Sequence, residues 1–534
     1  MYETVHERRY GAGMLEAGTA RNPGLRGDMS QTESRHFSKS YPQILKSASI
    51  IGGASAISII FRIIRAKFMA VLLGPSGIGL FGIYSSITDM VGTMVGMGIW
   101  SSGVRQIAEA TGTDDHEKIA RTIFTLRWVS LFLGVLGMIL VILLSSLICQ
   151  WTFGNSNSAS DIALLSVIIL FGSVSAGQSA LIQGMQRITD LAKLSVLGAF
   201  LGTAFGIPII YAWGEKGIVP LLIVLSGIGI LTSSWYARQI TTASVRLAWV
   251  EIWAEVKPLL KLGSVIMVSG LMTTGTMYLL RVLVVRQLNL EAAGLYQAAM
   301  ALSSIYVGFI LDSMGKDFYP RLTAVAQDDV ACNQLVNEQA EIGFLLAVPG
   351  ILASLTFAPI ILKIFYSGKF MAAFEVLRWQ ILGILLRVGS WPMGFILLAK
   401  GKSKLFFWTE FLANAAHLVL IWAGIAYFGL NGTGMAFFGM YVFYWILIYF
   451  VSKRLTGLTW SAENIRIASL ILPAVGIVFL SRFFLDEFWY LSLGGTITIA
   501  WGWYSLRSFV AIVRPNGISS LVLKIRNRFQ GGIA

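Results

Sequence analysis

Long apolar runs separated by short polar stretches make up most of this sequence. A window of about 19 residues, the length of helix that crosses the hydrocarbon core of a bilayer, finds about fourteen runs of spanning length. We therefore predict an all-α polytopic membrane protein. The predicted spans lie at 46–66, 77–103, 128–149, 161–183, 193–213, 217–236, 262–285, 293–314, 341–362, 376–399, 405–427, 432–451, 466–484 and 488–508.

The apolar pattern occurs twice, with the second copy 215 residues after the first. Each copy opens with an apolar helix rich in small residues, passes a short turn, and enters a second apolar helix at a Gly-Leu-aromatic step, at 79–81 and at 294–296. Parallel repeats of membrane helices are typical of transporters, whose two lobes rock around a site between them. The repeat predicts six-helix lobes over 43–240 and 241–455, followed by two extra helices over 456–510.

Composition supports the membrane assignment. Hydrophobic residues make up 56% of the chain and charged residues 13%, against roughly a quarter charged in soluble domains. Residues 1–42 carry five arginines and no apolar signal-peptide core, so we expect a disordered cytoplasmic tail, with Met29 as an alternative start. Residues 511–534 have the pattern of a basic amphipathic helix that lies on anionic membrane lipids.

The positions of Lys and Arg predict the orientation of the spans. With a cytoplasmic N-terminus, Lys and Arg recur in the connections on the cytoplasmic side, whereas the opposite connections 150–160 and 428–433 contain neither. By the positive-inside rule, both termini face the cytoplasm and the chain crosses the cell inner membrane many times. The net charge of +14 follows from this asymmetry, so we expect no nucleic-acid partner.

Charged side chains inside the predicted spans are the candidate functional residues, because each costs about 2.5–3.5 kcal/mol or more in the membrane. Arg62 and Arg65 share one face of the first helix with two serines, Arg281 lies on the seventh helix, and Arg387 lies near the middle of the tenth. These arginines predict a cationic cavity for a negatively charged head group. Snorkelling of Arg65 to the membrane surface explains that residue equally well.

Acidic residues and one histidine form a second set inside the spans. Asp89 lies near the centre of the second helix, as a counter-ion for a cavity arginine or as a cation-coupling site. Glu410, Asn414 and His417 follow the spacing i, i+4, i+7 and share one face of the eleventh helix. A carboxylate and an imidazole on one buried face can relay protons, but a hydrogen-bonded network that fixes helix packing explains the stripe equally well.

Signatures of an enzyme or a metal centre are absent from the sequence. The two cysteines, Cys149 near the outer end of the third span and Cys332 in an inner loop, cannot bridge in this topology. The sequence contains no CxxC or HExxH motif and no cluster of His and Cys. We therefore expect no metal, no cofactor and no catalytic residues.

Three stretches resemble the Wzx-type O-antigen flippases of the multidrug/oligosaccharidyl-lipid/polysaccharide exporter superfamily. They are LLGPSGIGLFGIYSSI (72–87), FYPRLT (318–323) and WQILGILLRVGSWPMGFILLAKGKSKLFFWTEF (379–411), and the resemblance extends over about 46–453. It implies two lobes around a V-shaped cavity. It also implies transfer of an undecaprenyl-diphosphate-linked glycan, an O-antigen or exopolysaccharide unit, from the cytoplasmic to the periplasmic leaflet, with proton or sodium coupling.

The same resemblance assigns expected roles to individual residues and partners. It implies that Arg62, Arg281 and Arg387 are cavity cations that bind the diphosphate or acidic sugars, with Asp89 as their acidic partner. Arg321, in the FYPRLT stretch, is the expected cytoplasmic-gate residue. Besides the lipid-linked glycan and membrane lipids, the expected partners are polysaccharide polymerase and chain-length proteins of lipopolysaccharide biosynthesis.

The chain departs from the family pattern at its C-terminal end, because typical members have twelve spans. In fourteen-span relatives the extra helices form a groove for the lipid tail, and an oligomer contact explains the extra helices here equally well. Two rival functions stay open. A drug or cation antiporter of the same superfamily requires an excess of buried carboxylates over arginines, and a membrane polysaccharide polymerase or ligase requires a long outer loop.

Overall fold

The computed structural model describes residues 25–112, 115–240 and 249–513. Within these ranges the chain is helical, and no strand is present. The helices are α1 (Leu25–Gly96), α2 (Ile99–Thr111), α3 (His116–Phe153), α4 (Ala159–Gly184), α5 (Ile188–Trp213), η1 (Gly214–Gly217), α6 (Ile218–Arg238), α7 (Trp249–Gln287), α8 (Leu290–Ala324), α9 (Asp329–Thr356), α10 (Ala358–Phe365), η2 (Gly368–Ala373), α11 (Phe374–Ala399), α12 (Ser403–Phe428), α13 (Leu430–Thr456), α14 (Ala462–Ser481) and α15 (Glu487–Val513).

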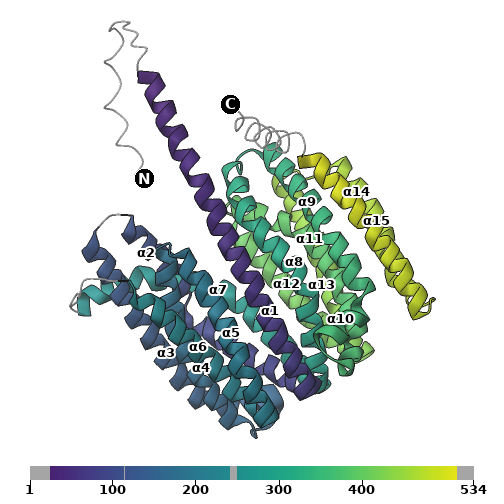
Figure 1. Ribbon diagram of the computed structural model, residues 1–534, viewed down its shortest axis with the longest axis horizontal. Helices are drawn as coiled ribbons and strands as arrows, with labels where there is room; N and C mark the ends of the chain where they lie inside the picture. The colour runs from purple at the N-terminus through teal and green to yellow at the C-terminus, as the bar shows by residue number, and fades with distance from the viewer. Residues whose placement is uncertain (1–24, 113–114, 241–248, 514–534) are drawn as a thin grey trace, which may run out of the picture.

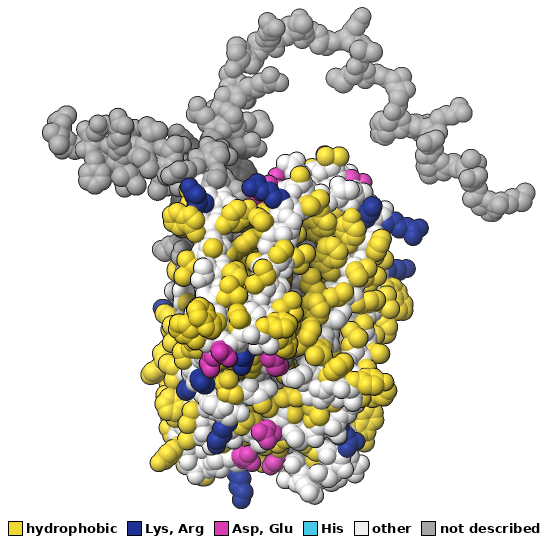
Figure 2. Space-filling view, turned by 90° about the vertical axis from the view of Figure 1, so that its right-hand side faces the viewer, with side chains coloured by type: hydrophobic (Ala, Val, Ile, Leu, Met, Phe, Trp, Pro, Cys, Tyr) yellow, Lys and Arg dark blue, Asp and Glu magenta, His cyan; other side chains and the backbone are white. Residues whose placement is uncertain are grey.

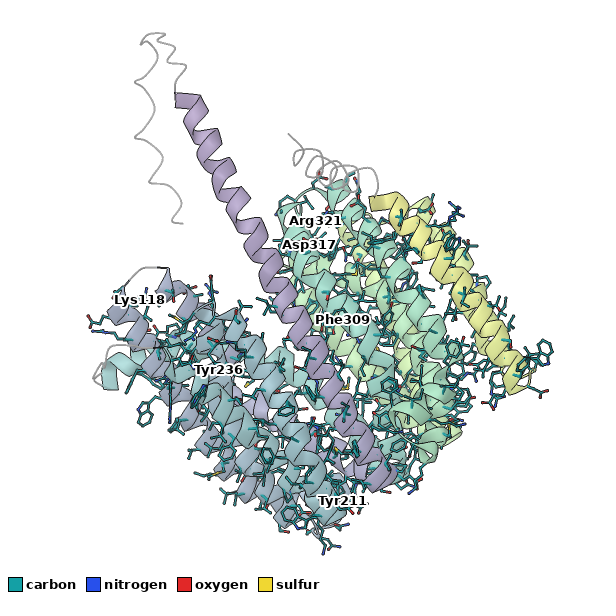
Figure 3. All side chains as sticks on the ribbon, in the orientation of Figure 1. Lys118, Tyr211, Tyr236, Phe309, Asp317 and Arg321 are labelled. Carbon is teal, nitrogen blue, oxygen red and sulfur yellow. The ribbon has the colours of Figure 1, made fainter. Side chains whose placement is uncertain are left out.

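The helices form two bundles with α1 running between them (Figure 1). One bundle contains α2–α6, and the other contains α8–α13 with α14 and α15 on its outer edge. Helix α1 packs against α5 of the first bundle and against α8 of the second, while α14 and α15 pack mainly on α9. Figure 3 labels Lys118 and Tyr211 at opposite ends of the first bundle, and we call these the Lys118 end and the Tyr211 end of the molecule.

Each of the fourteen predicted spans lies mostly on helix, and the all-α multi-pass fold is confirmed. By length and composition, ten stretches of the described chain are able to cross a membrane, with α5 and α6 counted together as Ile188–Arg238. Figure 2 shows that hydrophobic side chains cover most of the face at the right of Figure 1. Such a surface suits hydrocarbon rather than water. The division into two six-helix repeats and two extra helices stays a prediction.

The structure corrects three expectations about element boundaries. Helix α1 begins at Leu25, so the part of the predicted disordered tail over 25–42 is helical, because extending an existing helix is far easier than nucleating one. The predicted span 77–103 breaks at Met97 and Gly98, which both have positive φ. The predicted span 341–362 breaks at Phe357, where Pro359 starts α10. Residues 1–24 and the predicted amphipathic tail over 514–534 lie outside the described residues.

Gly74 turns the chain sharply within α1. Its backbone angles, φ 69° and ψ −167°, lie in a region that is essentially restricted to glycine. The kink separates a long limb ending at Leu73 from a second limb that starts at Pro75. The two limbs correspond to the first two predicted spans. Gly74 lies beside Lys369 of η2, which directly follows α10, and Figure 1 shows α10 toward the Tyr211 end of the molecule.

The two sequence copies meet through a symmetric glycine contact next to this kink. A Cβ atom on Gly79 would collide with the carbonyl oxygen of Leu290, and a Cβ atom on Gly294 would collide with that of Pro75. Both pairs are related by the 215-residue repeat offset, so each copy presents the same surface to the other, as in a two-fold interface. Small residues permit such close approach of membrane helices.

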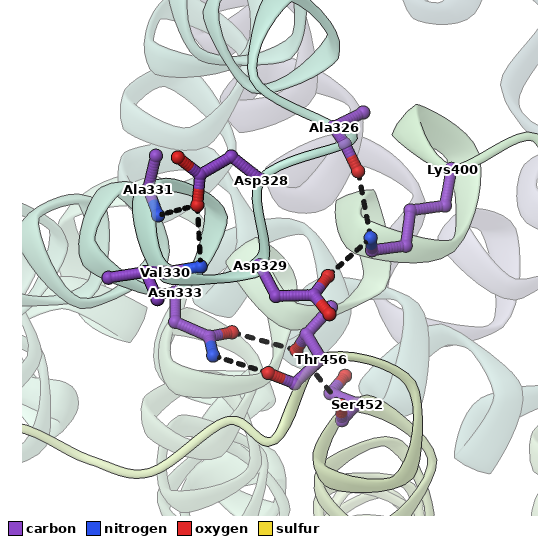
Figure 4. A network of polar contacts seen from close by, with 9 residues as sticks. All are labelled: Ala326, Asp328, Asp329, Val330, Ala331, Asn333, Lys400, Ser452 and Thr456. Carbon is purple, nitrogen blue, oxygen red and sulfur yellow. Dashed lines mark hydrogen bonds and ion pairs between the residues drawn. The ribbon is translucent and has the colours of Figure 1, made fainter.

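A polar network ties helix ends of the second bundle together at the other end of the molecule (Figure 4). The Lys400 ammonium lies 2.6 Å from the Asp329 carboxylate and also donates to the carbonyl oxygen of Ala326. The Asn333 side chain bonds both the carbonyl and the hydroxyl of Thr456. These bonds join the ends of α8, α9, α11 and α13.

We predict that Gly294→Ala destabilises the contact between the two copies. The added methyl group would overlap backbone atoms, which cannot rotate away, and overpacking of this kind costs about 1–3 kcal/mol. Thermal unfolding of the purified protein in detergent measures the loss. Gly92→Ala, on the same limb of α1 as Gly79, is the matched control, because a Cβ atom there has no neighbour within 4 Å. Equal effects of the two substitutions would contradict the contact.

Candidate functional site

A polar cavity lies on the side of the second bundle that meets α7. Its volume is about 370 Å³, and it is bounded by α7, α8, α11, α12 and α13. Arg387 of α11 and Glu410 of α12 line it together with aromatic and small polar side chains. Convergent polar groups in a largely apolar pocket are typical of binding sites. The polar and charged side chains that line the cavity include those of Thr273, Arg387, Glu410, Asn414, His417 and Tyr444.

Glu410 is held in place by its neighbours. The hydroxyl of Tyr444 on α13 donates to the Glu410 carboxylate at 2.8 Å, and the Asn414 side chain donates to the Glu410 carbonyl oxygen at 2.8 Å. Arg387 is close enough to interact electrostatically with Glu410, but no ion pair within 4.0 Å joins them in the part of the chain described. The cavity therefore contains an opposite pair of charges with room between them for a small ligand or water.

His417 lies on the wall of the same cavity, seven residues beyond Glu410. Its side chain is 2% exposed, its ring packs edge-on against Phe437 at 5.9 Å, and no hydrogen-bond partner for its Nε2 atom is found among the described residues. A buried polar atom without a partner is uncommon in proteins and indicates a water, an ion or a ligand as its partner. The predicted polar stripe of α12 thus faces one enclosed space.

Arg281 lies at the junction of the two sequence copies rather than in this cavity. Its Nε atom donates to the Gln297 side chain at 3.0 Å, and its charge interacts with Asp89 on the second limb of α1. Gln297 occupies the repeat position of Gly82 and lies over it, with the Gln297 side chain 3.3 Å from the place of a Gly82 Cβ atom. The first copy supplies space at this position, and the second copy fills that space with the side chain that holds Arg281.

Arg62 and Arg65 form a cationic pair on the first limb of α1. The Arg65 side chain lies across Gly202 and Gly206 of α5, where the absence of a Cβ atom makes room for it. Arg62 is exposed, and no acidic side chain pairs with either guanidinium within 4.0 Å among the described residues. Two neighbouring cations without an acidic partner in a spanning helix are suited to bind an anion.

In the structure, the predicted cations therefore lie at separate but neighbouring positions and do not form one cluster. Arg62 and Arg65 lie against α5, and Arg281 lies at the junction of α1, α7 and α8. Arg387 lies in the cavity of the second bundle, which also receives Met277, one helical turn before Arg281. Helices α1 and α7 pack against each other, so these places adjoin along the boundary between the bundles.

Arg321 lies near the Lys118 end of α8 and outside these places (Figure 3). It is exposed and pairs with Asp317, one helical turn earlier, at 3.2 Å. Exposed ion pairs of this kind contribute about 0–1 kcal/mol. The contacts of Arg321 show a surface pair on one helix, and its role as a gate stays a prediction.

Arg378 is a buried cation that the sequence patterns did not single out. Its side chain is 0% exposed, pairs with Glu375 at 2.7 Å, and lies 4.4 Å from the ring centre of Phe479 on α14. It also donates to the Phe479 carbonyl oxygen. The i, i+3 pairing with Glu375 was visible in the sequence, but the contacts with Phe479 and Phe483 join helices that are far apart in the chain. Arg378 fastens α14 to α11 and is structural.

In the part of the chain that the structure describes, no group of three or more His, Cys, Asp or Glu side chains is placed to hold a metal ion. Cys149 and Cys332 are both buried and unpaired with each other, as the topology requires.

Long apolar helices, two bundles and buried charge at their boundary define a multi-pass membrane transporter fold. A family profile described as "Polysaccharide biosynthesis protein" matches residues 68–375, and the chain belongs to this family. It is 22% identical over 418 residues to the lipid III flippase of Escherichia coli K12, covering 76% of this chain and 97% of the relative. It is 23% identical to a putative O-antigen transporter of Shigella flexneri over 389 residues, covering 71% and 91%.

Solved structures share this fold. The lipid II flippase MurJ in an inward closed conformation has a TM-score of 0.65 at 15% identity and covers 86% of this chain and 98% of its own. An inward-facing multidrug resistance transporter of the MATE family has a TM-score of 0.59 at 15% identity and covers 74% and 95%. The two-lobed architecture expected from the resemblance is the architecture of these proteins.

We predict that Arg378→Met destabilises the protein by about 2–3 kcal/mol, because it removes charge-assisted hydrogen bonds and three aromatic contacts around a fully buried guanidinium. Thermal unfolding in detergent measures this loss. Arg466→Met, which breaks an exposed pair with Glu463 at 3.5 Å, is the control and should change stability by less than about 1 kcal/mol. If both variants lost equally little stability, Arg378 would not hold α14 to α11.

Proposed function

We propose that this protein is a flippase that moves a lipid-linked oligosaccharide across the inner membrane, with the cytoplasm at the Lys118 end. The proposal is supported by the family membership and by the two relatives named as flippase and transporter. The observation that carries it is the series of arginines on spanning helices along the boundary of the bundles. An anionic diphosphate crossing a low-dielectric region needs such partners.

The proposed transport cycle is alternating access. The head group enters between the bundles from the cytoplasmic leaflet while its polyprenyl tail stays in the bilayer. At the Tyr211 end the copies touch through Gly79 and Gly294, and Lys67 of α1 donates to the carbonyl oxygens of Lys363 and Tyr366 at the end of α10. Separation of these contacts opens the periplasmic side. The substrate shifts this equilibrium only if it binds one state better than the other.

The direct test removes charge along the proposed path. The test variant combines Arg62→Gln, Arg281→Gln and Arg387→Gln in one chain. In a strain that lacks the natural gene, this variant should lower glycan export at least tenfold, because the diphosphate loses its cationic partners. Surface lipopolysaccharide or exopolysaccharide is the readout, and the amount of variant in the membrane is measured in parallel. Unchanged export would contradict the proposal.

A matched control separates site-specific effects from loss of net charge. Arg105, Arg121 and Arg466 are on helix surfaces and pair with acidic residues one turn away. Replacing these three with Gln removes the same three charges outside the proposed path. We expect export to stay within about twofold of the wild type, because exposed pairs of this kind contribute little.

We further propose that the cavity of the second bundle couples transport to protons. Glu410 and His417 are both on its wall, and His417 offers an unpartnered ring nitrogen. Protonation of a carboxylate or an imidazole changes the charge facing Arg387, and so changes how well the cavity accepts an anion. The same carboxylate is able to bind sodium, and the test distinguishes the two ions.

In proteoliposomes, a proton gradient should stimulate flipping by the wild type, and Glu410→Gln should reduce this stimulation at least fivefold. Glu463→Gln, which removes an exposed carboxylate outside the cavity, should keep the stimulation. Flipping is measured by access of an external glycosidase to a fluorescent lipid-linked glycan. Stimulation by a sodium gradient alone, or full proton stimulation in Glu410→Gln, would contradict proton coupling through this cavity.

A further inference from the structure

A long apolar groove lies outside the polar cavity, between α1 and α5 of the first bundle. Its volume is about 550 Å³, within the range of ligand-binding sites. Helix α1 contributes Ile50, Ala54, Ile57 and Phe61, which recur every three or four residues and form one apolar stripe. Val196 and Leu197 are on the opposite wall, on α5. The groove suits a hydrocarbon chain rather than a sugar.

The groove extends through one half of the membrane-spanning region. Residues 50–61 of α1 cover about 16 Å along the helix axis, close to the roughly 15 Å of one leaflet's hydrocarbon. On α5 the groove begins in the first turn, near Thr189, and ends at Phe200. Tyr236 also lines it, and Figure 3 places Tyr236 nearer the Lys118 end than the Tyr211 end. The groove thus spans the half of the bundle nearest the Lys118 end.

Specific contacts between the helices build the floor of the groove. The hydroxyls of Ser58 and Ser195 are hydrogen-bonded at 3.0 Å, and Thr203 donates to the carbonyl oxygen of Phe61 at 2.9 Å. The rings of Phe61 and Phe200 pack edge to face at 5.4 Å and close the deep end. These bonds join α1 to α5 beside the groove.

One cation lines the apolar wall near its Lys118 end, and another lies just beyond its other end. Lys193 lines the groove in the second turn of α5, is exposed, and forms no ion pair within 4.0 Å among the described residues. Just beyond the aromatic end, Arg65 lies across Gly202 and Gly206 of the same helix. An anionic head group would meet a cation at the mouth of the groove and a second one at mid-membrane depth. A lipid with one anionic head group and one long apolar tail fits this arrangement of cations and apolar surface.

We propose that the groove between α1 and α5 holds the polyprenyl chain of the lipid-linked substrate, with Lys193 receiving its diphosphate in the leaflet at the Lys118 end. This inference rests on the proposed function and deepens it. Helices α14 and α15 pack on α9 of the other bundle, so the tail site is on the opposite bundle from these extra helices. The tail then accompanies the head group along α1 toward Arg62 and Arg65.

Photo-crosslinking tests the proposed occupant. The full chain is placed in vesicles of phosphatidylethanolamine and phosphatidylglycerol that contain undecaprenyl diphosphate with a diazirine in its isoprenoid chain. After illumination, labelled peptides should map to residues 50–61 and 189–200. A parallel sample contains phosphatidylethanolamine with a diazirine in its acyl chain. Excess unlabelled undecaprenyl diphosphate should reduce labelling of both peptides by the first probe at least tenfold.

Two variants make the test specific to the groove. Val196→Trp fills it and should lower labelling at least fivefold. Leu231→Trp adds the same side chain to an exposed position of α6 in the same bundle, at 71% exposure, and should leave labelling unchanged. Thermal unfolding shows that each variant is folded. A second filling variant, Ala54→Trp on the facing wall, replaces Val196→Trp if that variant does not fold.

The outcomes separate this inference from the proposed function. If the wild type binds and flips the polyprenyl probe but its label maps elsewhere, the groove is not the tail site and the flippase proposal stands. If the phospholipid probe labels the groove as strongly and competes with the polyprenyl probe, the groove is a general lipid contact and the inference is wrong. If the wild type neither binds nor flips the polyprenyl probe, the proposed function fails as well.

Discussion

The cost of placing charge in hydrocarbon is the constraint on which this structure depends. An arginine in a membrane-spanning helix needs a polar or charged partner in the protein, a water-filled cavity or a ligand. Arg378 pairs with Glu375, packs on the ring of Phe479 and fastens two helices. Arg62, Arg65 and Arg387 have no acidic partner within 4.0 Å among the described residues, whereas Arg281 donates to the Gln297 amide and its charge interacts with Asp89. On this difference rests our proposal that Arg62, Arg281 and Arg387, unlike Arg378, bind the substrate.

One helix crossing explains both how the two sequence copies fit together and why the buried charge beside them is placed asymmetrically. Gly79 and Gly294 let two equivalent helices approach so closely that their backbones touch. One turn further along, Gly82 of the first copy faces Gln297 of the second, and Gln297 holds Arg281. The symmetric contact positions the copies, and the copies differ at the Gly82/Gln297 position beside it, where only the second copy supplies the amide that holds Arg281. A substrate with a single anionic head requires such asymmetry.

The helices were predictable from the sequence because apolar length alone identifies a membrane span. The i, i+4, i+7 spacing also predicted that Glu410, Asn414 and His417 face one space, since helix geometry places them on one side. The breaks at Met97 and Phe357 were missed because a hydropathy window averages over single residues. Nor could the sequence show that Arg387 lies apart from Arg65, or that Arg378 meets Phe479, since these relations depend on packing between distant helices.

The central claim is that the arginines along the boundary of the bundles recognise the diphosphate of a polyprenyl lipid. Native mass spectrometry of the protein in lipid nanodiscs can compare undecaprenyl diphosphate with uncharged undecaprenol, which differ in the head group alone. The account predicts at least tenfold tighter binding of the diphosphate, and loss of this preference when Arg62, Arg281 and Arg387 are all glutamine. Equal binding of the two lipids by the wild type would contradict it.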